Sequence, residues 1–251
     1  MNSFWAGLQF LTRIRIVRKT NWTEEDFGGS VKYFPLYGAI IGIILMAGDY
    51  VFNLFFPPLL TAAFILMLEV YLTGGIHLDG FMDTMDGLYS GREPARMLEI
   101  MRDSRVGAHS VTALGLLYLV KFSIYYEFPQ ELLIPALGVM PVLGRWAMVI
   151  GITQFPYARP AGMGKCFREF SGRSALYVAT FLAAAAAAML GWPGAVVFCV
   201  VGAYACLFCR RVSMKLGGLT GDVYGAVTEL AQVVAMLVFY LASMWMWPLL
   251  L

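Results

Sequence analysis

Three aspartates stand at a regular spacing directly after a long apolar run. They are Asp79, Asp83 and Asp86, within the stretch GGIHLDGFMDTMDGLYSG that begins at Gly74. The i, i+4, i+7 spacing predicts that all three lie on one face of a helix, where like charges repel one another. A cation would offset that repulsion, and a shell of oxygen ligands favours a hard ion such as Mg²⁺ or Mn²⁺. Because Mg²⁺ commonly keeps waters and takes phosphate oxygens as further ligands, the stretch predicts a metal site that binds a phosphate substrate.

Two more carboxylates could complete the metal shell. Glu69 lies near the end of the preceding apolar run, where an ionised group is costly without a partner. Asp103 lies in the basic stretch GREPARMLEIMRDSRVGAH. Arginine binds phosphate oxygens through paired hydrogen bonds, so we expect the arginines of this stretch to contact phosphate. They are Arg92, Arg96, Arg102 and Arg105. The sequence therefore predicts a diphosphate bound through a metal ion to the carboxylates and directly to the arginines.

The chain has only two histidines, His77 and His109, which argues against a zinc site built from several histidines. His77 precedes Asp79 by two residues. Its position is compatible with a catalytic role and equally with a structural hydrogen bond at the start of the helix.

Two further polar stretches interrupt the apolar sequence. GGLTGDVYGAVTE contains Asp222 and, seven residues later on the same helical face, Glu229. Its glycines suit a backbone cradle for an anion at a helix start, and a capped helix with nothing bound is the alternative. PYARPAGMGKCF offers Arg159 and Lys165. Arg145 is an intramembrane charge and therefore a site candidate, for which Glu69 or Glu229 could be the partner.

A simpler interpretation of the charged residues is a solvated loop in which aspartates and arginines pair in water, because such surface pairs are common and nearly neutral in energy. The regular DxxxDxxDG spacing argues against it.

The elements that position these residues follow from composition. Of the 251 residues 60% are hydrophobic and 14% are charged, which is typical of a membrane protein. Continuous apolar runs of about 20 residues predict helices and argue against a barrel. The predicted fold is all-α, a polytopic transmembrane helical bundle with about seven spans. The spans are 36–56, 59–75, 108–126, 132–152, 174–190, 194–209 and 227–247. The glycines of a GxxxG spacing, Gly38 and Gly42, predict close helix packing.

Lysine and arginine occur in alternate connections between these spans. The other connections, near Pro57, over 127–131 and over 191–193, contain neither residue. Because cytoplasmic loops retain positive charge, the N-terminus and the acidic stretch are predicted to lie on the cytoplasmic side. We expect one integral-membrane domain over 1–251, with 1–35 as an N-terminal interfacial segment and 77–107 as the cytoplasmic catalytic segment. An eighth short membrane segment is the alternative for the N-terminus.

The order of these motifs resembles the cobalamin synthase family, also called adenosylcobinamide-GDP ribazoletransferases. The resemblance covers nearly the whole chain. It rests on YFPLYGAIIG, E…GGIHLDGFMDTMDG, MLEIMRDSRVGAHS, GR at Gly144 and Arg145, YARPAGMG and GGLTGDVYGAVTE. It implies a Mg²⁺-dependent enzyme of the bacterial inner membrane that joins adenosylcobinamide-GDP to α-ribazole or its 5′-phosphate. GMP is released, and the product is adenosylcobalamin or its 5′-phosphate.

The resemblance also implies partners and residue roles. The partners are the two small-molecule substrates and the lipid bilayer, with no nucleic acid; a homo-oligomer and other enzymes of cobalamin biosynthesis stay open. Asp79, Asp83 and Asp86 would hold one or two Mg²⁺ ions, completed by Glu69 or Asp103. Arg102 and Arg105 would hold the diphosphate, and His77 or one of the three aspartates, such as Asp86, would accept the proton of the attacking ribose hydroxyl. The expected substrate-binding residues are Arg92, Arg96, Arg145, Arg159, Lys165, Asp222 and Glu229.

Two other classes of membrane protein use similar residues. A CDP-alcohol phosphotransferase also combines spaced aspartates, metals and a nucleotide diphosphate, but the downstream half of its expected pattern is missing here. A cation-coupled transporter usually places its acids near mid-bilayer and has repeated halves. This chain has most of its acids at one predicted membrane edge and shows no repeat.

Overall fold

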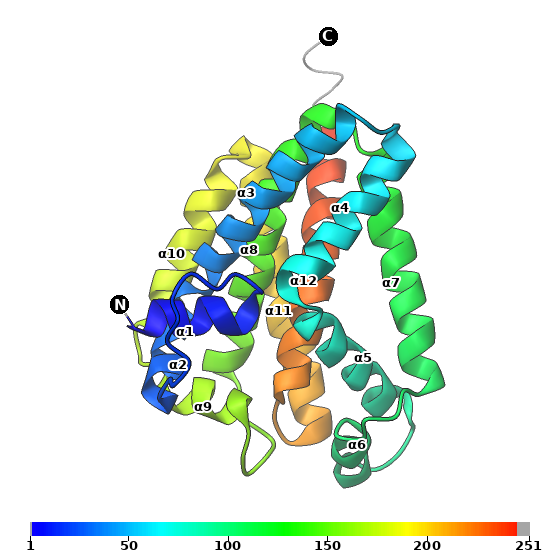
Figure 1. The fold of residues 1–251 in the computed structure, drawn as a ribbon. Helices are drawn as coiled ribbons and strands as arrows, with labels where there is room; N and C mark the ends of the chain where they lie inside the picture. The colour runs from blue at the N-terminus through cyan, green and yellow to red at the C-terminus, as the bar shows by residue number, and fades with distance from the viewer. Residues whose placement is uncertain (1, 245–251) are drawn as a thin grey trace.

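The structure is a computed structural model that describes residues 2–244, and these form a bundle of helices (Figure 1). The first half of the chain forms α1 (Asn2–Leu11), α2 (Glu24–Ser30), the 3-10 turn η1 (Val31–Tyr33), α3 (Phe34–Asn53), α4 (Pro58–Thr73), α5 (Ile76–Tyr89) and α6 (Pro94–Ile100). The second half forms α7 (Ala108–Glu127), α8 (Gln130–Gln154), α9 (Met163–Phe170), α10 (Ala175–Ala188), α11 (Gly191–Leu216) and α12 (Gly221–Met244). The predicted all-α class is confirmed.

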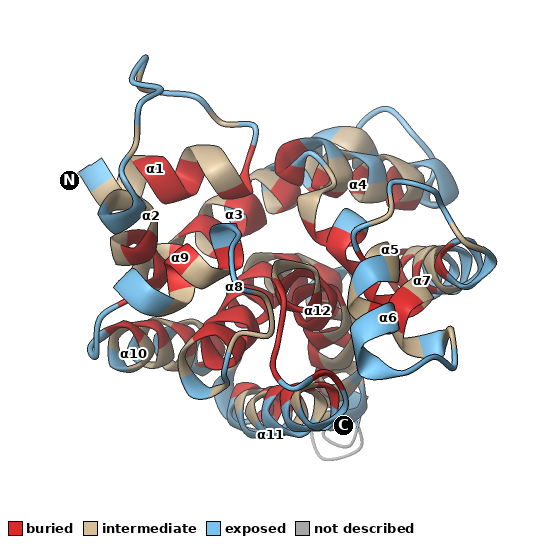
Figure 2. Cartoon of the chain, turned by 90° about the horizontal axis from the view of Figure 1, so that it is seen from below, coloured by how far each residue is buried: buried red, intermediate tan, exposed pale blue. Residues whose placement is uncertain are grey.

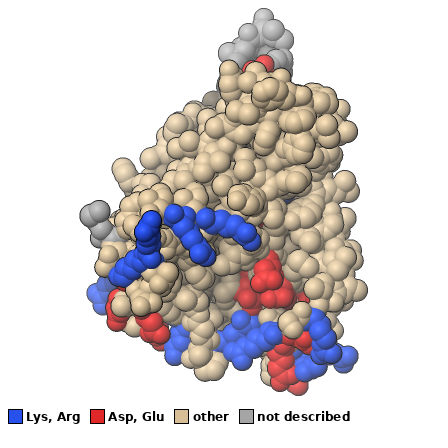
Figure 3. All heavy atoms as spheres, viewed as in Figure 1, with Lys and Arg blue, Asp and Glu red and all other residues tan. Residues whose placement is uncertain are grey.

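Helices α8 and α12 lie at the centre of the bundle. Helix α8 packs against α3, α10, α11 and α12, and α12 packs in turn against α5 and α11. Figure 2 shows their buried surfaces at the centre and exposed surfaces around the outside. Figure 3 shows most acidic and many basic side chains at the end of the bundle where α5, α6 and α9 lie, with a further row of basic side chains at the level of α1. We call the end with α5, α6 and α9 the charged end.

Five helical stretches are long and apolar enough to cross a membrane: Glu24–Asn53, Ala108–Glu127, Gln130–Gln154, Gly191–Leu216 and Gly221–Met244. Helices α4 and α5 meet the same test only together, and the 91° bend between them is that of a broken span or a re-entrant loop. The predicted count of seven spans is therefore not confirmed. Helix α10 has 14 residues, or about 21 Å, which is short of the roughly 30 Å hydrocarbon core. The end of the last predicted span, 245–247, lies outside the described residues.

Helix α1 lies across the side of the bundle, over α3 (Figure 1). Its ten residues span about 15 Å, half of the hydrocarbon core, so it does not supply an eighth span. Leu8 and Leu11 are buried against the bundle, while Arg13 and Arg15, which follow the helix, are exposed. The placement of 1–35 at a membrane interface stays a prediction for 1–23, whereas residues 24–35 belong to the stretch Glu24–Asn53, which is long and apolar enough to span a membrane.

Glycines permit the closest approach between α3 and α8. A Cβ atom added at Gly38 would collide with the carbonyl oxygen of Pro141, and one added at Gly42 would collide with that of Gly138. The two backbones are therefore in direct contact, as the GxxxG spacing predicts.

The double glycine at the end of α4 turns the chain sharply. Gly74 has φ +64° and Gly75 has φ +75°, a left-handed conformation that residues with a Cβ rarely adopt. This turn produces the 91° bend between α4 and α5. The helix that carries the three aspartates consequently leaves the direction of α4 and runs along α12.

Candidate active site

Two glycines bring α5 directly against α12. A Cβ atom added at Gly80 would lie 2.8 Å from the carbonyl oxygen of Asp222, and one added at Gly225 would lie 2.8 Å from that of His77. No side chain separates the helices at this crossing. The contact therefore places the start of α5, with Asp79, beside the start of α12, with Asp222.

The loop after α8 is held against the segment before α12. Tyr157 and Leu219 form an isolated parallel β-bridge. The Ala158 N–H donates to the Leu219 carbonyl at 2.8 Å, and the Leu219 N–H donates to the Pro156 carbonyl at 2.8 Å. Lys165 Nζ closes the loop by donating to the Pro160 carbonyl at 2.9 Å. These bonds fix the backbone from which Arg159 projects.

Arg159 joins three of the polar stretches. Its Nη2 atom lies 2.7 Å from Oδ2 of Asp222 and donates to the Met101 carbonyl at 3.4 Å. Thr220 Oγ1 donates to the same Asp222 oxygen at 3.2 Å and accepts the Val223 N–H at 3.3 Å, as expected for a capped helix. Segments far apart in the sequence thus meet at the start of α12.

A cavity of about 520 Å³ opens where these segments meet. This volume lies within the range of small-molecule sites. Its charged lining comprises Asp79, Arg102, Arg159 and Asp222, and His77, Tyr157 and Tyr224 add further polar groups. Its apolar lining includes Phe10, Leu11, Ile76, Met148 and Phe167. The cavity therefore offers both charges and an apolar wall to one ligand, and we call it the charged cavity.

The three carboxylates on α5 repel one another, and two of them, Asp79 and Asp83, lack protein partners among residues 2–244. The negative charges that act on half-buried Asp83 are those of Asp222, Asp79 and Asp86, and the opposing positive charge is that of Arg159. Within 2–244, the side chains of Asp79 and Asp83 form no hydrogen bond or ion pair. No three metal-ligating side chains converge into a ready-made metal site in the same part of the chain. A metal here would therefore need oxygens from a substrate or from water, which is ordinary for Mg²⁺.

Asp86 has a structural partner instead. Its Oδ2 accepts the Gly107 N–H at 2.7 Å and its Oδ1 accepts the Ser110 N–H at 2.9 Å. Gly107 is the N-cap residue of α7 and has no side chain with which to cap the helix. Asp86 supplies this cap from another helix, so both of its oxygens are already engaged. Sequence spacing placed Asp86 with the other two aspartates but did not reveal this role.

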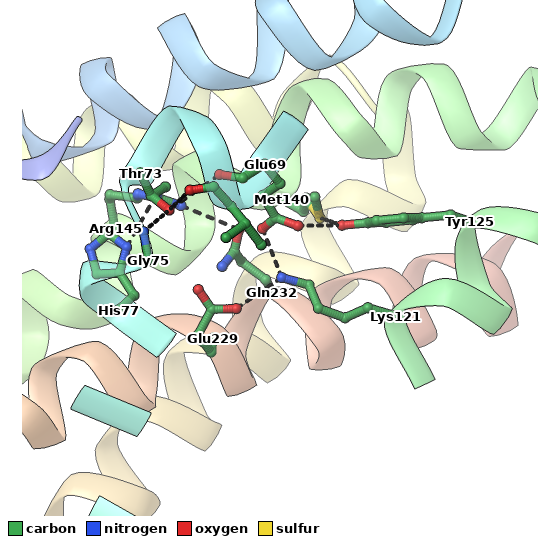
Figure 4. A network of polar contacts seen from close by, with 11 residues as sticks. Glu69, Thr73, Gly75, His77, Lys121, Tyr125, Met140, Arg145, Glu229 and Gln232 are labelled. Atoms are coloured by element: carbon green, nitrogen blue, oxygen red, sulfur yellow. Dashed lines mark hydrogen bonds and ion pairs between the residues drawn. The ribbon is translucent and has the colours of Figure 1, made fainter. Parts of the chain in front are cut away.

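Glu69 and Glu229 lie deeper in the bundle and do not line the charged cavity. Lys121 Nζ lies 2.7 Å from Oε1 of Glu69 and 2.9 Å from Oε2 of Glu229, and the Tyr125 hydroxyl donates to Glu69 Oε2 at 2.8 Å. Figure 4 shows Lys121 reaching between the two glutamates. Glu69 was expected to complete a metal shell with Asp79, but in the structure its oxygens contact Lys121 and Tyr125. Lys121 was not among the residues singled out from the sequence, although a lysine inside an apolar run is a signal that could have revealed it.

Arg145 is fully buried, and among residues 2–244 it forms no direct ion pair with Glu69 or Glu229, the two possible partners. Its Nη1 donates to Gln232 Oε1 at 3.2 Å, and its Nη2 lies 3.5 Å from His77 Nδ1 (Figure 4). An arginine has no acceptor, so this contact makes Nδ1 of His77 the acceptor and leaves the hydrogen on Nε2. His77 Nε2 is buried without a protein partner among the described residues. His77 lines the charged cavity, and its Nε2 is the ring nitrogen left without a protein partner within 2–244.

The remaining predicted residues lie nearer the surface. Arg105 Nη2 lies 2.6 Å from Asp103 Oδ2. The hydrogen bonds that Arg105 donates to the Asp103 carboxyl from its side chain and its backbone lower the pKa of that carboxyl to about 2. Arg96 pairs with Glu99 at 2.6 Å. Arg92 is exposed and lines a shallow surface hollow with Arg96, apart from the charged cavity. Of the arginines in this basic stretch, Arg102 alone lines the charged cavity.

Comparisons with known proteins agree with the arrangement of motifs. Residues 3–240 match the model of a family described as cobalamin-5-phosphate synthase. An adenosylcobinamide-GDP ribazoletransferase of Desulfitobacterium hafniense is 44% identical over 243 residues, covering 94% of this chain and 96% of that one. Enzymes of the same name from Desulforamulus reducens (37% identical, covering 92% and 93%) and Acetivibrio thermocellus (36%, covering 92% and 94%) are also similar. No solved structure matches. The chain belongs to the cobalamin-5-phosphate synthase family of enzymes.

Proposed function

We propose that the charged cavity joins adenosylcobinamide-GDP to α-ribazole or its 5′-phosphate, with release of GMP. The observation that carries this proposal is the convergence of Asp79, Asp222, Arg102 and Arg159 on one cavity. The names of the relatives support the same reaction. None of the relatives named above is called a CDP-alcohol phosphotransferase or a transporter, so the two alternative classes gain no support.

The residues at the cavity fit a divalent cation. Asp79 lines the cavity and Asp83 lies one turn further along α5, and both offer carboxylate oxygens without protein partners among residues 2–244. Asp222 lines the cavity as well, and its negative charge acts on Asp83. We assign these three to a site for Mg²⁺, with Mn²⁺ as a substitute, because oxygen donors suit these ions. When bound, the ion would neutralise charge on the phosphate oxygens. In Asp86, Glu69 and Asp103 both carboxylate oxygens already have protein partners, whereas Asp222 uses only Oδ2 among the described residues, so the first three residues are left out of this assignment.

The basic residues at the cavity suit the diphosphate. Arg159 is held in place by Asp222, and its buried Nε has no protein partner among the described residues, so it can donate to a phosphate oxygen. Arg102 reaches the same cavity. Gly221 lines the cavity at the N-terminus of α12, where the helix dipole favours an anion.

The bond changes follow from the substrates. A ribose hydroxyl oxygen of α-ribazole attacks the phosphorus attached to the cobinamide, and the bond from that phosphorus to the bridging oxygen of the diphosphate breaks. GMP leaves with the bridging oxygen, so charge develops on oxygens that arginine can stabilise. We assign the hydroxyl proton to a carboxylate of Asp79 or Asp83. His77 serves as a hydrogen-bond donor because its hydrogen lies on Nε2.

We also propose a bacterial inner-membrane location with the charged end in the cytoplasm. Support comes from the lysines and arginines, many of which lie at the charged end (Figure 3). Cytoplasmic loops retain such residues. Both substrates would then enter the charged cavity from the cytoplasm.

The test is GMP release by purified protein in detergent, supplied with adenosylcobinamide-GDP, α-ribazole and Mg²⁺. We expect Asp83→Asn to lower turnover at least about 100-fold, the scale of a lost electrostatic contact at a reaction centre. Asp103→Asn is the matched control, because Asp103 lies outside the charged cavity and pairs with Arg105. Full turnover by Asp83→Asn would remove Asp83 from the site, and no GMP from the unaltered chain would refute the proposed reaction.

A further inference from the structure

A second hollow, of about 680 Å³, lies behind the helix that carries the aspartates. It is lined by α5, α7, α11 and α12, and most of the lining is apolar. Representative lining residues are Phe81, Met85, Leu117, Phe208 and Val233. We call it the apolar groove. It shares no lining residue with the charged cavity, so α5 separates the two: Asp79 and Gly80 line the cavity, whereas Phe81 and Met85 line the groove.

The apolar groove is open on its outer side. Helix α5 packs against α7, and α11 packs against α12, so α7 and α11 form the two edges of the groove. Leu116 and Val120 line it from α7 and remain largely exposed. Both edge helices are among those long and apolar enough to span a membrane. The opening therefore faces the region that acyl chains occupy.

Positive charge marks one end of the apolar groove. Arg211 and Lys215 lie one helical turn apart on α11, and the lining contains no acidic residue. Arg211 is exposed and has no ion pair or hydrogen bond among residues 2–244. Lys215 Nζ donates to the Leu88 carbonyl at 2.8 Å, which leaves two of its hydrogens for another acceptor. An anionic group above an apolar tail matches this distribution.

The length of the groove fits one leaflet. Its lining on α11 extends from Lys215 to Tyr204, which is about 16 Å of helix. Half of the hydrocarbon core is about 15 Å thick. We propose that the apolar groove binds an anionic phospholipid, with the phosphate at Arg211 and Lys215 and an acyl chain along α5, α7 and α12.

A second copy of the chain fits the groove less well. A twofold interface places the same surface on both subunits. Arg211 and Lys215 of each copy would then lie against the same groove surface of the other copy, whose lining has no acidic residue to offset them. Like charges brought together in this way are unfavourable. A lipid phosphate provides the missing negative charge.

Native mass spectrometry of the full chain tests the proposal, using phosphatidylglycerol and phosphatidylcholine with identical acyl chains. We expect the unaltered protein to retain phosphatidylglycerol at a lipid concentration at least about tenfold lower, because two cations attract an anionic headgroup. Arg211→Gln should remove most of this preference without loss of an internal contact. Arg210→Gln is the matched control, since Arg210 is on the same helix but does not line the groove.

Ala113→Trp provides a second variant, because a large side chain at this position would fill the groove. It should reduce retention of both lipids, and an excess of sn-glycerol 3-phosphate should not displace phosphatidylglycerol from the unaltered protein. The proposal is overturned if Arg211→Gln keeps the full preference or if glycerol phosphate alone displaces the lipid. It is also overturned if Ala113→Trp instead breaks up an oligomer, since the groove would then be a subunit interface.

Discussion

Arg159 Nη2 lies 2.7 Å from Asp222 Oδ2, which ties the loop after α8 to the first turn of α12. The β-bridge between Tyr157 and Leu219 supports this ion pair from the backbone. Because α12 also contacts α5 through Gly80, the pair lies next to the aspartates of α5. One ion pair therefore organises the acidic and the basic sides of the charged cavity.

Arg159→Lys should lower turnover by roughly 100-fold while leaving the protein folded, because lysine keeps the charge but loses the planar donor pair. Steady-state GMP release gives the rate, and size-exclusion chromatography in detergent gives the folded fraction. Arg168→Lys serves as the control, since Arg168 donates to the Thr153 carbonyl outside the cavity lining. Equal turnover for Arg159→Lys and the unaltered enzyme would show that Arg159 does not bind the diphosphate.

Asp86→Ala should act on stability more than on metal binding. Loss of an N-cap typically costs about 1 kcal/mol, and Asp86 supplies both cap contacts of α7. We expect a lower midpoint of thermal unfolding in detergent and an unchanged affinity for Mn²⁺. The opposite result, unchanged thermal unfolding with lost Mn²⁺ affinity, would identify Asp86 as a metal ligand.

Lys121→Met should destabilise the bundle by about 3–5 kcal/mol, because it leaves Glu69 and Glu229 as buried carboxylates without their cation. The triple variant Lys121→Met, Glu69→Gln, Glu229→Gln should recover much of that loss, since it removes the charges together. Denaturant unfolding in mixed micelles measures both. A Lys121→Met protein as stable as the unaltered chain would contradict the role of this buried ion-pair network.

His77→Gln should retain more activity than His77→Phe, because the glutamine amide can present an N–H close to the position of Nε2. We expect the glutamine variant to remain within about tenfold of the unaltered rate and the phenylalanine variant to lose roughly 100-fold. Rates of GMP release at saturating substrates give the comparison. Equal rates for the two variants would show that the N–H of His77 is not used.

Local patterns in the sequence predicted much of the fold and part of the site. The helical class follows from long apolar runs, and the contact of Gly38 and Gly42 with α8 follows from their spacing. The i, i+4 spacing of Asp79 and Asp83 is a property of a single helix; the structure places Asp79 in the lining of the charged cavity and Asp83 one turn further along α5, where the charges of Asp79 and Asp222 act on it. Such features depend only on residues close together in the chain.

Features that depend on distant partners could not be predicted in this way. Asp86 fits the helical spacing as well as Asp83 does, yet its carboxylate caps α7, because Gly107 lacks a side chain for that purpose. Glu69 pairs with Lys121, and only the packing of α4, α7 and α12 brings Lys121 between two glutamates. The seven-span count was not confirmed because α4 and α10 are shorter than a bilayer crossing.

The central claim is that Asp79, Asp83 and Asp222 bind a divalent cation at the charged cavity. Electron paramagnetic resonance of Mn²⁺ with purified protein and adenosylcobinamide-GDP tests it most directly. We predict a bound-Mn²⁺ signal that the Asp79→Asn, Asp222→Asn double variant weakens at least about tenfold and that Asp103→Asn leaves unchanged. The absence of bound Mn²⁺ in the unaltered protein, or an unchanged signal in the double variant, would contradict the claim.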